Sequence, residues 1–224
     1  MFDKRPFSAK RYALAAAGMA LLACGLLLGG TWHARAWYST DMTDTLPQLQ
    51  FTMKRSSDGK EVTAADYKGK IVLLYFGYTY CPDVCPTTLF HVSNILKKLG
   101  AKANDVRMLF VTVDPNRDTL PVLKQYTNAF APQIVGLRGT PNELATLAKR
   151  YRVSYSVTPA SPGHPYEVTH SASVYVFDRD GNIKLLFTNL SSANAKVGGN
   201  TADLHELIAQ SGHPSLWQRV LHVF

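Results

Sequence analysis

The chain alternates apolar runs with segments of helical periodicity. Residues 70–76 and 107–113 are nearly continuous apolar runs, a pattern typical of strands that are covered on both faces. Apolar positions at three- and four-residue spacing follow each run and predict a helix: Leu89, Val92, Leu96 and Leu99 after the first, and Leu123, Tyr126 and Phe130 after the second. The strand–helix order therefore occurs twice in succession.

A third strand–helix unit follows these two, and a hairpin precedes all three. Residues 134–137 predict a short strand, and Thr140 to Glu143 is a capping-box sequence with Pro141 at the first helical position. Residues 51–67 predict a hairpin whose turn has the sequence Ser-Asp-Gly-Lys.

The last part of the domain has a different order. After a loop rich in proline and glycine at 157–165, residues 172–177 and 183–187 predict two strands, and the Asp-Gly pair between them is a strong hairpin signal. A flexible loop over residues 191–200 and a helix capped by Thr201 complete the pattern. Three strand–helix units followed by two strands and a helix predict an α/β sandwich around a central mixed sheet.

The N-terminal part predicts export. Residues 13–30 carry no charge, and this stretch is just long enough to span a bilayer as a helix. Four basic residues precede it within residues 1–12, and only Arg35 follows it closely. By the positive-inside tendency, residues 1–12 stay in the cytoplasm. We therefore expect a single-pass protein of the inner (cytoplasmic) membrane whose domain faces the periplasm or the equivalent extracytoplasmic space.

Two other interpretations of this segment agree with the sequence. Residues 34–36 (Ala-Arg-Ala) have the form of a signal-peptidase site, which would make the segment a cleaved signal. Residues 21–24 (Leu-Leu-Ala-Cys) resemble a lipoprotein processing site with Cys24 as the acylated residue, although the apolar run continues past it. All three interpretations place the domain outside the cytoplasm.

The basic net charge does not favour nucleic-acid binding. Of the formal charge of +8, residues 1–36 contribute +4, from five basic residues and one acidic residue. The other 19 basic and 15 acidic residues are spread over the domain and contribute the remaining +4. No run of Lys or Arg with interleaved aromatic residues occurs after residue 36. We therefore expect no nucleic-acid partner.

The cysteines point to chemistry rather than to a structural staple. Cys24 lies within the apolar segment, so of the three cysteines only Cys81 and Cys85 belong to the exported domain. A disulfide between residues four apart would add little stability, because the entropic benefit of closing a loop grows with its length. The pair is better explained by reactivity or by metal binding.

The position of the pair supports this interpretation. Residues 77–86 (GYTYCPDVCP) join the end of a predicted strand to the start of a helix. Open α/β sheets carry their sites in such loops, and a helix N-terminus lowers the pKa of a cysteine. Two sulfurs at this spacing can form a disulfide or hold one soft ion, and thiolates favour Cu(I) and zinc.

His170 is the one convincing candidate for a third ligand, and the alternative is a histidine that only caps a strand. A structural zinc site normally needs four protein ligands, and the domain offers only one further candidate, at the entrance of the strand 172–177. That strand can lie beside residues 70–76, which would direct its entrance toward Cys81 and Cys85. Two thiolates and an imidazole hold Cu(I) and also tolerate Cu(II).

Four segments resemble the signature of the Sco/SenC/PrrC family, thioredoxin-like copper proteins that help to assemble the binuclear copper site of cytochrome c oxidase. They are residues 76–86 (FGYTYCPDVCP), 114–119 (DPNRDT), 135–140 (VGLRGT) and 166–170 (YEVTH), which lie in the family's order within residues 47–210. The CPDVCP string is highly specific. Tyr80, where the family often has histidine, and the position of Pro121 are small departures.

The resemblance implies that Cys81, Cys85 and His170 are copper ligands and that the domain has a thioredoxin-like fold. It implies a copper metallochaperone rather than an enzyme in the turnover sense, with the copper-bearing subunit of cytochrome c oxidase as a partner and other copper chaperones as further candidates. The expected parts of the chain are a cytoplasmic basic segment (1–12), a transmembrane anchor (13–30), a linker (31–46), the copper-binding domain (47–212) and a C-terminal tail (213–224).

The main alternative is a membrane-anchored thiol–disulfide oxidoreductase, in which Cys81 and Cys85 reduce the cysteines of a partner. Metal binding requires the same reduced pair, so both functions are compatible. A peroxidase needs one thiolate poised against a peroxide, and the set of two cysteines and a histidine makes that function a poor fit.

Other polar residues near the motifs are expected to be structural. Asp83 is either a metal ligand or a helix cap, and the cap is favoured. Arg117 between Asp114 and Asp118 predicts an ion pair and a turn in preference to a partner-docking role. Five histidines without a partner at a ligand spacing are expected on the surface: His91, His164, His205, His213 and His222.

Overall fold

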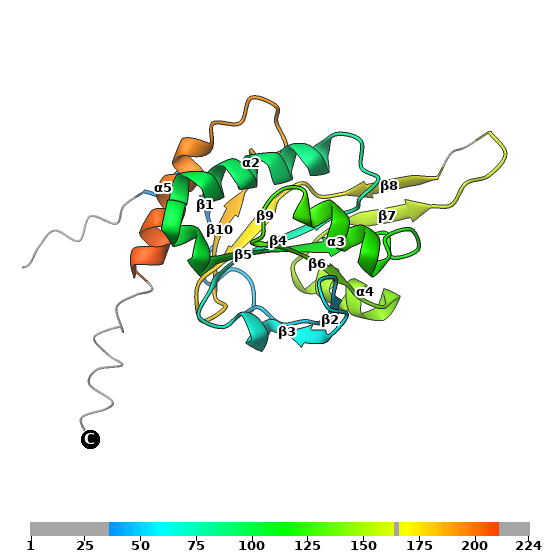
Figure 1. Cartoon of the computed structure of the whole chain (residues 1–224), viewed down its shortest axis with the longest axis horizontal. Helices are drawn as coiled ribbons and strands as arrows, with labels where there is room; N and C mark the ends of the chain where they lie inside the picture. Colours follow the sequence, from blue (N-terminus) through cyan, green and yellow to red (C-terminus); the bar gives the residue numbers. More distant parts are fainter. Residues whose placement is uncertain (1–35, 164–165, 211–224) are drawn as a thin grey trace, which may run out of the picture. The chain divides into compact units, whose positions relative to one another are not determined.

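The computed structural model describes residues 36–163 and 166–210 (Figure 1). The chain divides into two compact units, Met1–Ala36 and Trp37–Phe224, and the described elements belong to the second. An eight-stranded sheet has the order β1-β10-β9-β4-β5-β6-β2-β3, and β7 and β8 form a separate two-stranded sheet. The strands are β1 (Thr40–Asp41), β2 (Thr52–Arg55), β3 (Glu61–Thr63), β4 (Ile71–Gly77), β5 (Val106–Thr112), β6 (Ile134–Arg138), β7 (Tyr155–Thr158), β8 (Glu167–His170), β9 (Val174–Phe177) and β10 (Ile183–Phe187). The helices are α2 (Val84–Leu99), α3 (Leu120–Asn128), α4 (Pro141–Arg150) and α5 (Val197–Gln210), with short 3-10 helices η1 (Ala64–Tyr67) and η2 (Gly100–Asp105).

The centre of the sheet consists of three parallel strands, β4, β5 and β6. They correspond to the three apolar runs, and every residue of β4 is buried. β9 pairs antiparallel with β4, so the predicted neighbourhood of these two strands is confirmed. The α/β sandwich around a mixed sheet is therefore confirmed as well.

The periodicity predicted the buried face of α2, whereas α3 ends at Asn128, so the predicted position Phe130 lies beyond that helix. Leu89, Val92, Leu96 and Leu99 of α2 are all buried, and α2 packs against α5. The capping box of α4 is present, because the Glu143 amide donates to Thr140 Oγ1 at 3.3 Å and the Thr140 amide to Glu143 Oε2 at 2.7 Å. The predicted hairpins β2–β3 and β9–β10 also form.

Three local predictions were wrong. The loop at 157–165 is shorter than expected, because residues on both sides of it pair as β7 and β8. The last helix begins at Val197, and Thr201 lies inside it, where its hydroxyl donates to the carbonyl of Val197 at 2.8 Å. β1 lies in the predicted linker and pairs with the edge of β10, which no periodicity over two residues could indicate.

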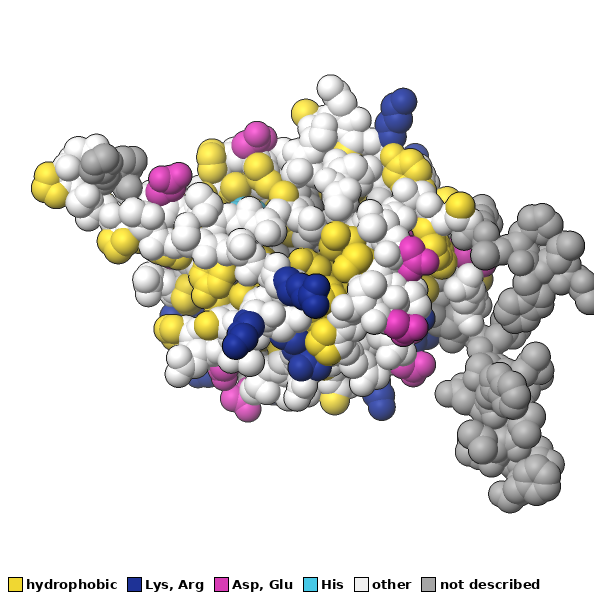
Figure 2. All heavy atoms as spheres, turned by 180° about the vertical axis from the view of Figure 1, so that it is seen from behind, with side chains coloured by type: hydrophobic (Ala, Val, Ile, Leu, Met, Phe, Trp, Pro, Cys, Tyr) yellow, Lys and Arg dark blue, Asp and Glu magenta, His cyan; other side chains and the backbone are white. Residues whose placement is uncertain are grey.

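The predicted anchor at 13–30, the basic segment 1–12, the two processing sites near Cys24 and Arg35, and the tail 213–224 lie outside the described residues. Within the described ranges, no helix is both long and apolar enough to cross a membrane. On the face seen in Figure 2, Lys and Arg side chains form small groups near the middle, and Asp and Glu side chains lie around them.

A buried carboxylate joins the loop after β4 to the end of β5. Asp118 has no solvent exposure, and it accepts hydrogen bonds from the Thr79 amide at 3.0 Å, the Thr79 hydroxyl at 2.6 Å and the Thr112 hydroxyl at 2.6 Å. Because a buried carboxylate without partners is strongly unfavourable, this arrangement fixes where Thr79 lies. The cysteine motif follows two residues later.

We expect Asp118→Ala to lower the free energy of unfolding by about 2–4 kcal/mol, because it leaves one buried and two partly buried donors without an acceptor. Urea denaturation followed by fluorescence measures the change. Asp105→Ala is the matched control, since Asp105 is exposed, forms a surface ion pair with Arg179 at 3.2 Å, and should cost less than about 1 kcal/mol. Equal losses in both variants would contradict the assignment.

Candidate metal centre

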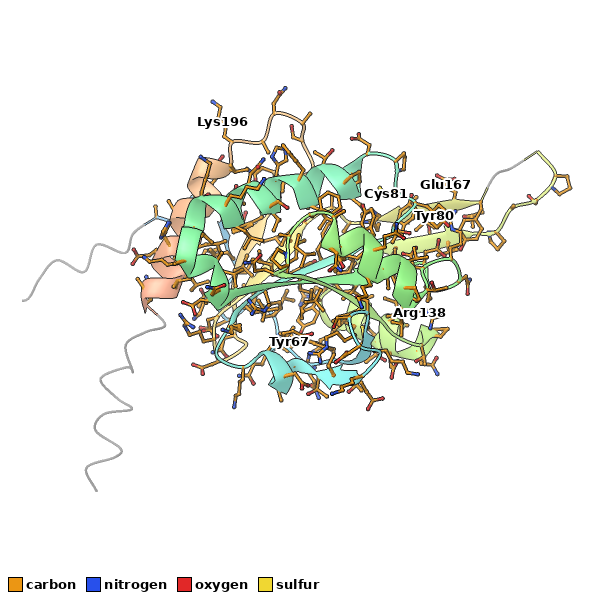
Figure 3. All side chains as sticks on the ribbon, viewed as in Figure 1. Tyr67, Tyr80, Cys81, Arg138, Glu167 and Lys196 are labelled. Atoms are coloured by element: carbon orange, nitrogen blue, oxygen red, sulfur yellow. The ribbon has the colours of Figure 1, made fainter. Side chains whose placement is uncertain are left out.

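The loop between β4 and α2 presents Cys81 at the carboxyl end of the central strand (Figure 3), and Cys85 follows at the start of α2. β4 ends at Gly77 and α2 begins at Val84, so Cys85 lies in the first turn of the helix and is buried, whereas Cys81 lies in the loop and is half-buried. The Cys85 amide donates to Cys81 Sγ at 3.4 Å. The start of the helix thus turns an unpaired N–H toward the first sulfur, as expected for a cysteine at a helix N-terminus.

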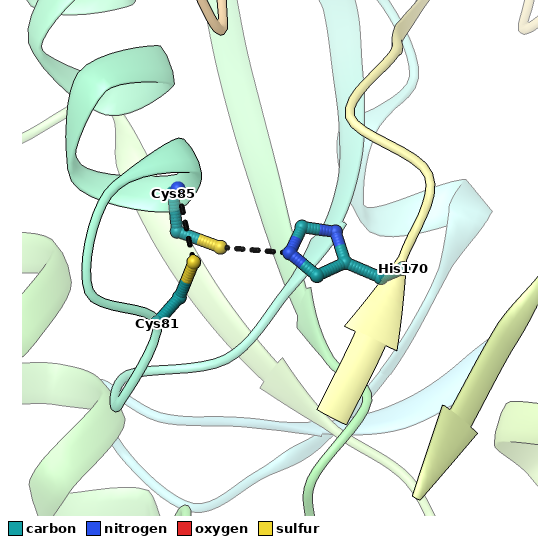
Figure 4. A group of neighbouring side chains, drawn as sticks. All are labelled: Cys81, Cys85 and His170. Atoms are coloured by element: carbon teal, nitrogen blue, oxygen red, sulfur yellow. Dashed lines mark hydrogen bonds between the residues drawn. The ribbon is translucent and has the colours of Figure 1, made fainter. Parts of the chain in front are cut away.

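His170 reaches the same point from a distant part of the chain (Figure 4). It is the last residue of β8, and its Nε2 lies 3.3 Å from Cys85 Sγ. Its Nδ1 lies 3.0 Å from the carbonyl oxygen of Ser171. Because a carbonyl oxygen only accepts, Nδ1 donates this hydrogen bond, and Nε2 is the ring nitrogen that faces the sulfurs and could bind a metal ion. The ligand atoms of the three residues all lie within 4.8 Å of one another.

Aromatic rings and a glycine shape the space around the sulfurs. The Tyr75 hydroxyl donates to Cys85 Sγ at 3.6 Å, and the rings of Tyr75 and Tyr78 meet the His170 ring edge-on, with centroids 6.0 and 5.7 Å away. A Cβ atom on Gly77 would lie 2.8 Å from Cys85 Sγ. The sulfur therefore occupies the volume that a side chain at position 77 would need, which explains the glycine at the end of the strand.

The two thiols differ in acidity. The Cys85 thiol donates toward the Cys81 sulfur and, with the other hydrogen bonds to that sulfur, lowers the pKa of Cys81 to about 3, although partial burial opposes this change. Burial raises the pKa of Cys85 far above its usual range, and the neighbouring charge of Cys81 adds to the effect. At neutral pH the pair therefore consists of a half-buried thiolate and a buried thiol.

This donor set fits a soft metal ion. Bonds from thiolate or imidazole to such an ion are about 2.0–2.3 Å long, so ligand atoms within 4.8 Å of one another can share one ion with little rearrangement. Two sulfurs and an imidazole nitrogen match the preferences of Cu(I) and zinc. In the described part of the chain, this is the one group of at least three such side chains that could hold a metal ion.

The remaining acidic candidates lie in structural roles. Asp83 precedes α2 at the N-cap position, but its carboxylate is exposed and accepts from the Thr87 hydroxyl at 3.2 Å instead of capping a backbone amide. The predicted ion pair between Arg117 and Asp114 is confirmed. Asp114 also accepts a hydrogen bond from the Tyr166 hydroxyl at 2.7 Å.

The histidines are only partly as expected. His91 is buried, with 6% of its surface exposed, because its Nε2 meets the carbonyl oxygen of Ser192 at 3.1 Å. The prediction that it lies on the surface was therefore wrong. His205 is partly exposed, and its Nδ1 is 3.4 Å from Lys102 Nζ. His164, His213 and His222 lie outside the described residues.

Sequence reasoning missed the tyrosines that surround the centre. Tyr75 belongs to the apolar run of β4, a pattern that predicts only a core position, while Tyr78 and Tyr166 lie within the family motifs, which assign them no role. An aromatic residue within four positions of a ligand is a signal that could have found Tyr78 before Cys81 and Tyr166 before His170, but not Tyr75.

A family model described as SCO1/SenC matches residues 43–204. Among curated proteins, the chain is 39% identical over 136 residues to "Protein SCO2 homolog, mitochondrial" of Bos taurus, covering 60% of this chain and 50% of that protein. It is 35% identical over 176 residues to the Mus musculus protein of the same name, covering 74% and 68%. The chain spans about half the length of most of the curated relatives that it matches, from 42% to 68%.

Solved structures of similar proteins have the same fold. Bradyrhizobium japonicum ScoI with copper bound is 38% identical with a TM-score of 0.63, covering 71% of this chain and 98% of that one. Apo Sco1 from Thermus thermophilus is 31% identical with a TM-score of 0.65, covering 80% and 99%. Yeast Sco1 with copper bound is 33% identical with a TM-score of 0.63, covering 78% and 94%. The expected thioredoxin-like fold of the domain is therefore confirmed.

The difference in acidity predicts which cysteine reacts. In the metal-free reduced protein, iodoacetamide should modify Cys81 before Cys85. The rate of modification of Cys81 should change less than about twofold between about pH 5 and 8, because the lowered pKa keeps Cys81 a thiolate over this range. The rate of an ordinary thiol would fall about tenfold for each pH unit below its pKa. Peptide mass spectrometry at several pH values measures the rate.

Cys85→Ala removes the donor to Cys81 and should restore a pH-dependent rate, whereas Cys85→Ser keeps a hydroxyl donor and should alter the profile less. Faster modification of Cys85 than of Cys81 in the parent protein would contradict the prediction.

Proposed function

The chain belongs to the SCO1/SenC family, and from this premise we propose that it is a copper metallochaperone that binds Cu(I) or Cu(II) through Cys81, Cys85 and His170. The observation that carries the proposal is the approach of two sulfurs and one imidazole nitrogen to within 4.8 Å of one another. Copper-bound structures of relatives from Bradyrhizobium japonicum and yeast support the choice of metal.

The geometry suggests an order of events in copper capture. The Cys81 thiolate is half-buried and already ionised, so it meets an incoming copper ion first. Cys85 releases its proton as its sulfur joins the ion, because metal binding stabilises the thiolate form. His170 Nε2 completes the ligand set, and the Ser171 carbonyl holds the ring in the tautomer that leaves this nitrogen free.

Copper is cargo in this proposal, so the ligand set must also release it. Three ligands leave the ion open to attack by a ligand of a second protein, which allows transfer by stepwise exchange. The partner we infer is the copper-bearing subunit of cytochrome c oxidase, and the proteins that load the domain with copper are a second class of partner.

The proposed location follows from the N-terminal sequence. An anchor at residues 13–30, preceded by four basic residues, would hold the domain on the outer face of the inner membrane, toward the periplasm or the equivalent extracytoplasmic space. Several curated relatives carry the word mitochondrial in their names. A space outside the inner membrane exists in bacteria and in mitochondria, so the proposed orientation applies to either.

A thiol–disulfide oxidoreductase is the second candidate, and the difference between the two thiols favours it. A partly exposed low-pKa thiolate beside a buried thiol is the arrangement in which one sulfur attacks a disulfide and the other resolves the mixed disulfide. Cys81 would attack and Cys85 would resolve. The two activities need the same reduced pair, so they are compatible in one protein.

His170→Ala separates the two functions. We expect copper retention against a competing Cu(I) chelator to fall at least about 100-fold, because the ion loses its nitrogen ligand. This loss should exceed the roughly 10- to 100-fold loss that is usual when a residue hydrogen-bonded to a ligand is removed. The rate at which the reduced protein cleaves a small aromatic disulfide should change less than about threefold, since both sulfurs remain.

His205→Ala is the matched control, because His205 lies on α5 outside the Cys/Cys/His group, and it should leave both measurements unchanged. Copper retention in His170→Ala equal to that of the parent protein would refute the ligand assignment.

A further inference from the structure

The hairpin that carries His170 is not part of the main sheet. β7 and β8 pair only with each other in the described ranges, and the eight-stranded sheet ends elsewhere, at β1 and β3. Isolated two-stranded hairpins are marginally stable in water, so other contacts must hold this one in place. Val168 lies in the core, and Tyr155, Val157 and Tyr166 pack against it. Apolar contacts have no preferred direction, so they do not by themselves fix the orientation of the hairpin end.

Polar contacts at Tyr166, which directly precedes β8, supply that orientation. The Tyr166 hydroxyl donates to Asp114 Oδ1 at 2.7 Å, and the Asp114 side chain has no solvent exposure. Arg117 Nε donates to the other oxygen of the same carboxylate. Asp114 is therefore a buried charge whose two oxygens are satisfied by a hairpin residue and by a cation.

The guanidinium of Arg117 also contacts the cysteine loop. Its central carbon lies 4.1 Å from the centroid of the Tyr166 ring, 4.8 Å from that of Tyr80 and 5.8 Å from that of Tyr78. These distances are within the range of cation–π attraction. Tyr80 immediately precedes Cys81, and the Tyr78 ring also meets the His170 ring edge-on.

One cation thus joins the two segments that carry the sulfurs and the imidazole. Tyr78 and Tyr80 belong to the cysteine loop, Tyr166 belongs to the hairpin, and Arg117 comes from the turn between β5 and α3. The Arg117 side chain is still 32% exposed, so solvent and partners can reach it. We call Asp114, Arg117 and Tyr166 the clasp.

We propose that the clasp holds the His170 hairpin against the cysteine loop, and that its opening withdraws the imidazole and sets how fast copper leaves. The effect on copper release rests on the proposed function, whereas the holding of the hairpin by the clasp concerns the protein without metal. Asp114, Arg117 and Tyr166 are positioning residues. When the clasp opens, the ion keeps the two sulfurs and loses the nitrogen, which exposes it to a ligand from another protein.

Arg117→Gln tests the mechanical part without copper. In the reduced, metal-free protein, amide hydrogen exchange of residues 166–170 should accelerate about tenfold, because the hairpin loses a stacked cation and the buried Asp114 loses its partner. Exchange in β4 and β9 should not change. Tyr166→Phe keeps the ring and removes only the hydroxyl, so it should give a smaller acceleration in the same residues.

The same variants test the consequence for copper. Transfer of Cu(I) to a competing chelator should be about tenfold faster in Arg117→Gln and intermediate in Tyr166→Phe. In the Cu(II) form, the nitrogen hyperfine splitting in the EPR spectrum should weaken, which a purely structural role would not cause. Arg117→Lys keeps the charge without the planar fork, and it should restore the splitting only in part.

Arg55→Gln is the matched control. Arg55 forms an ion pair with Asp58 three residues away and is 29% exposed, so it matches Arg117 in exposure and in the spacing of the pair, although Asp58 is 33% exposed and Asp114 is buried. Within the described residues, Arg55 makes no cation–π contact with the tyrosines of the two ligand-bearing segments. It should leave hairpin exchange and copper transfer unchanged. Unchanged hairpin exchange in Arg117→Gln, or equal effects of Arg55→Gln and Arg117→Gln, would overturn the proposal. If Arg117→Gln does not fold, Tyr166→Phe decides by the same criteria.

The two proposals fail in different ways. A parent protein that binds no copper, with hairpin exchange that still responds to Arg117→Gln, refutes the metallochaperone function and supports the clasp. A parent protein that binds copper, with release and exchange that do not respond, refutes the clasp and leaves the metallochaperone function in place.

Discussion

The pairing of β4 with β9 is the constraint on which the metal centre depends. The two strands run antiparallel at the centre of the sheet, with Leu74 opposite Tyr175, so the start of β9 lies at the end of β4 where the cysteine loop begins. His170 precedes β9 by a few residues and therefore comes to the same edge. A register shift of one residue would turn the side chains of β9 to the opposite face of the sheet, so core packing brings the chain near His170 to this edge, while the contacts of the hairpin orient the imidazole.

Different burial then gives the two cysteine thiols different protonation states. Cys85 loses contact with water and keeps its proton, and its hydrogen bonds to Cys81 lower the pKa of that thiol, so that Cys81 becomes a thiolate. The same arrangement suits the capture of a soft cation and nucleophilic attack on a disulfide, because each begins with an accessible thiolate. The histidine is what distinguishes the two functions, since a dithiol exchange needs no imidazole.

Two buried carboxylates from one short motif hold the surroundings of the site. Asp118 binds Thr79 and Thr112, and so fixes the cysteine loop to β5, while Asp114 binds Tyr166 and Arg117, and so reaches the hairpin. Because a buried charge requires partners, each carboxylate determines which segments lie next to the turn. Residues 114–119 therefore organise a site to which they contribute no ligand atom.

The sequence alone determined the elements whose signals are local: the apolar runs of the three parallel strands, the capping box at Thr140, the β9–β10 hairpin, and Cys81, Cys85 and His170 as the residues to bring together. Only the tertiary structure decided the β7–β8 hairpin, the burial of His91 beside Ser192, and the contact of Arg117 with tyrosines from two segments. The physical reason is range. Periodicity and capping depend on residues within about one helical turn of each other, whereas these contacts depend on strand order and register, which place residues far apart in the chain at one sheet edge.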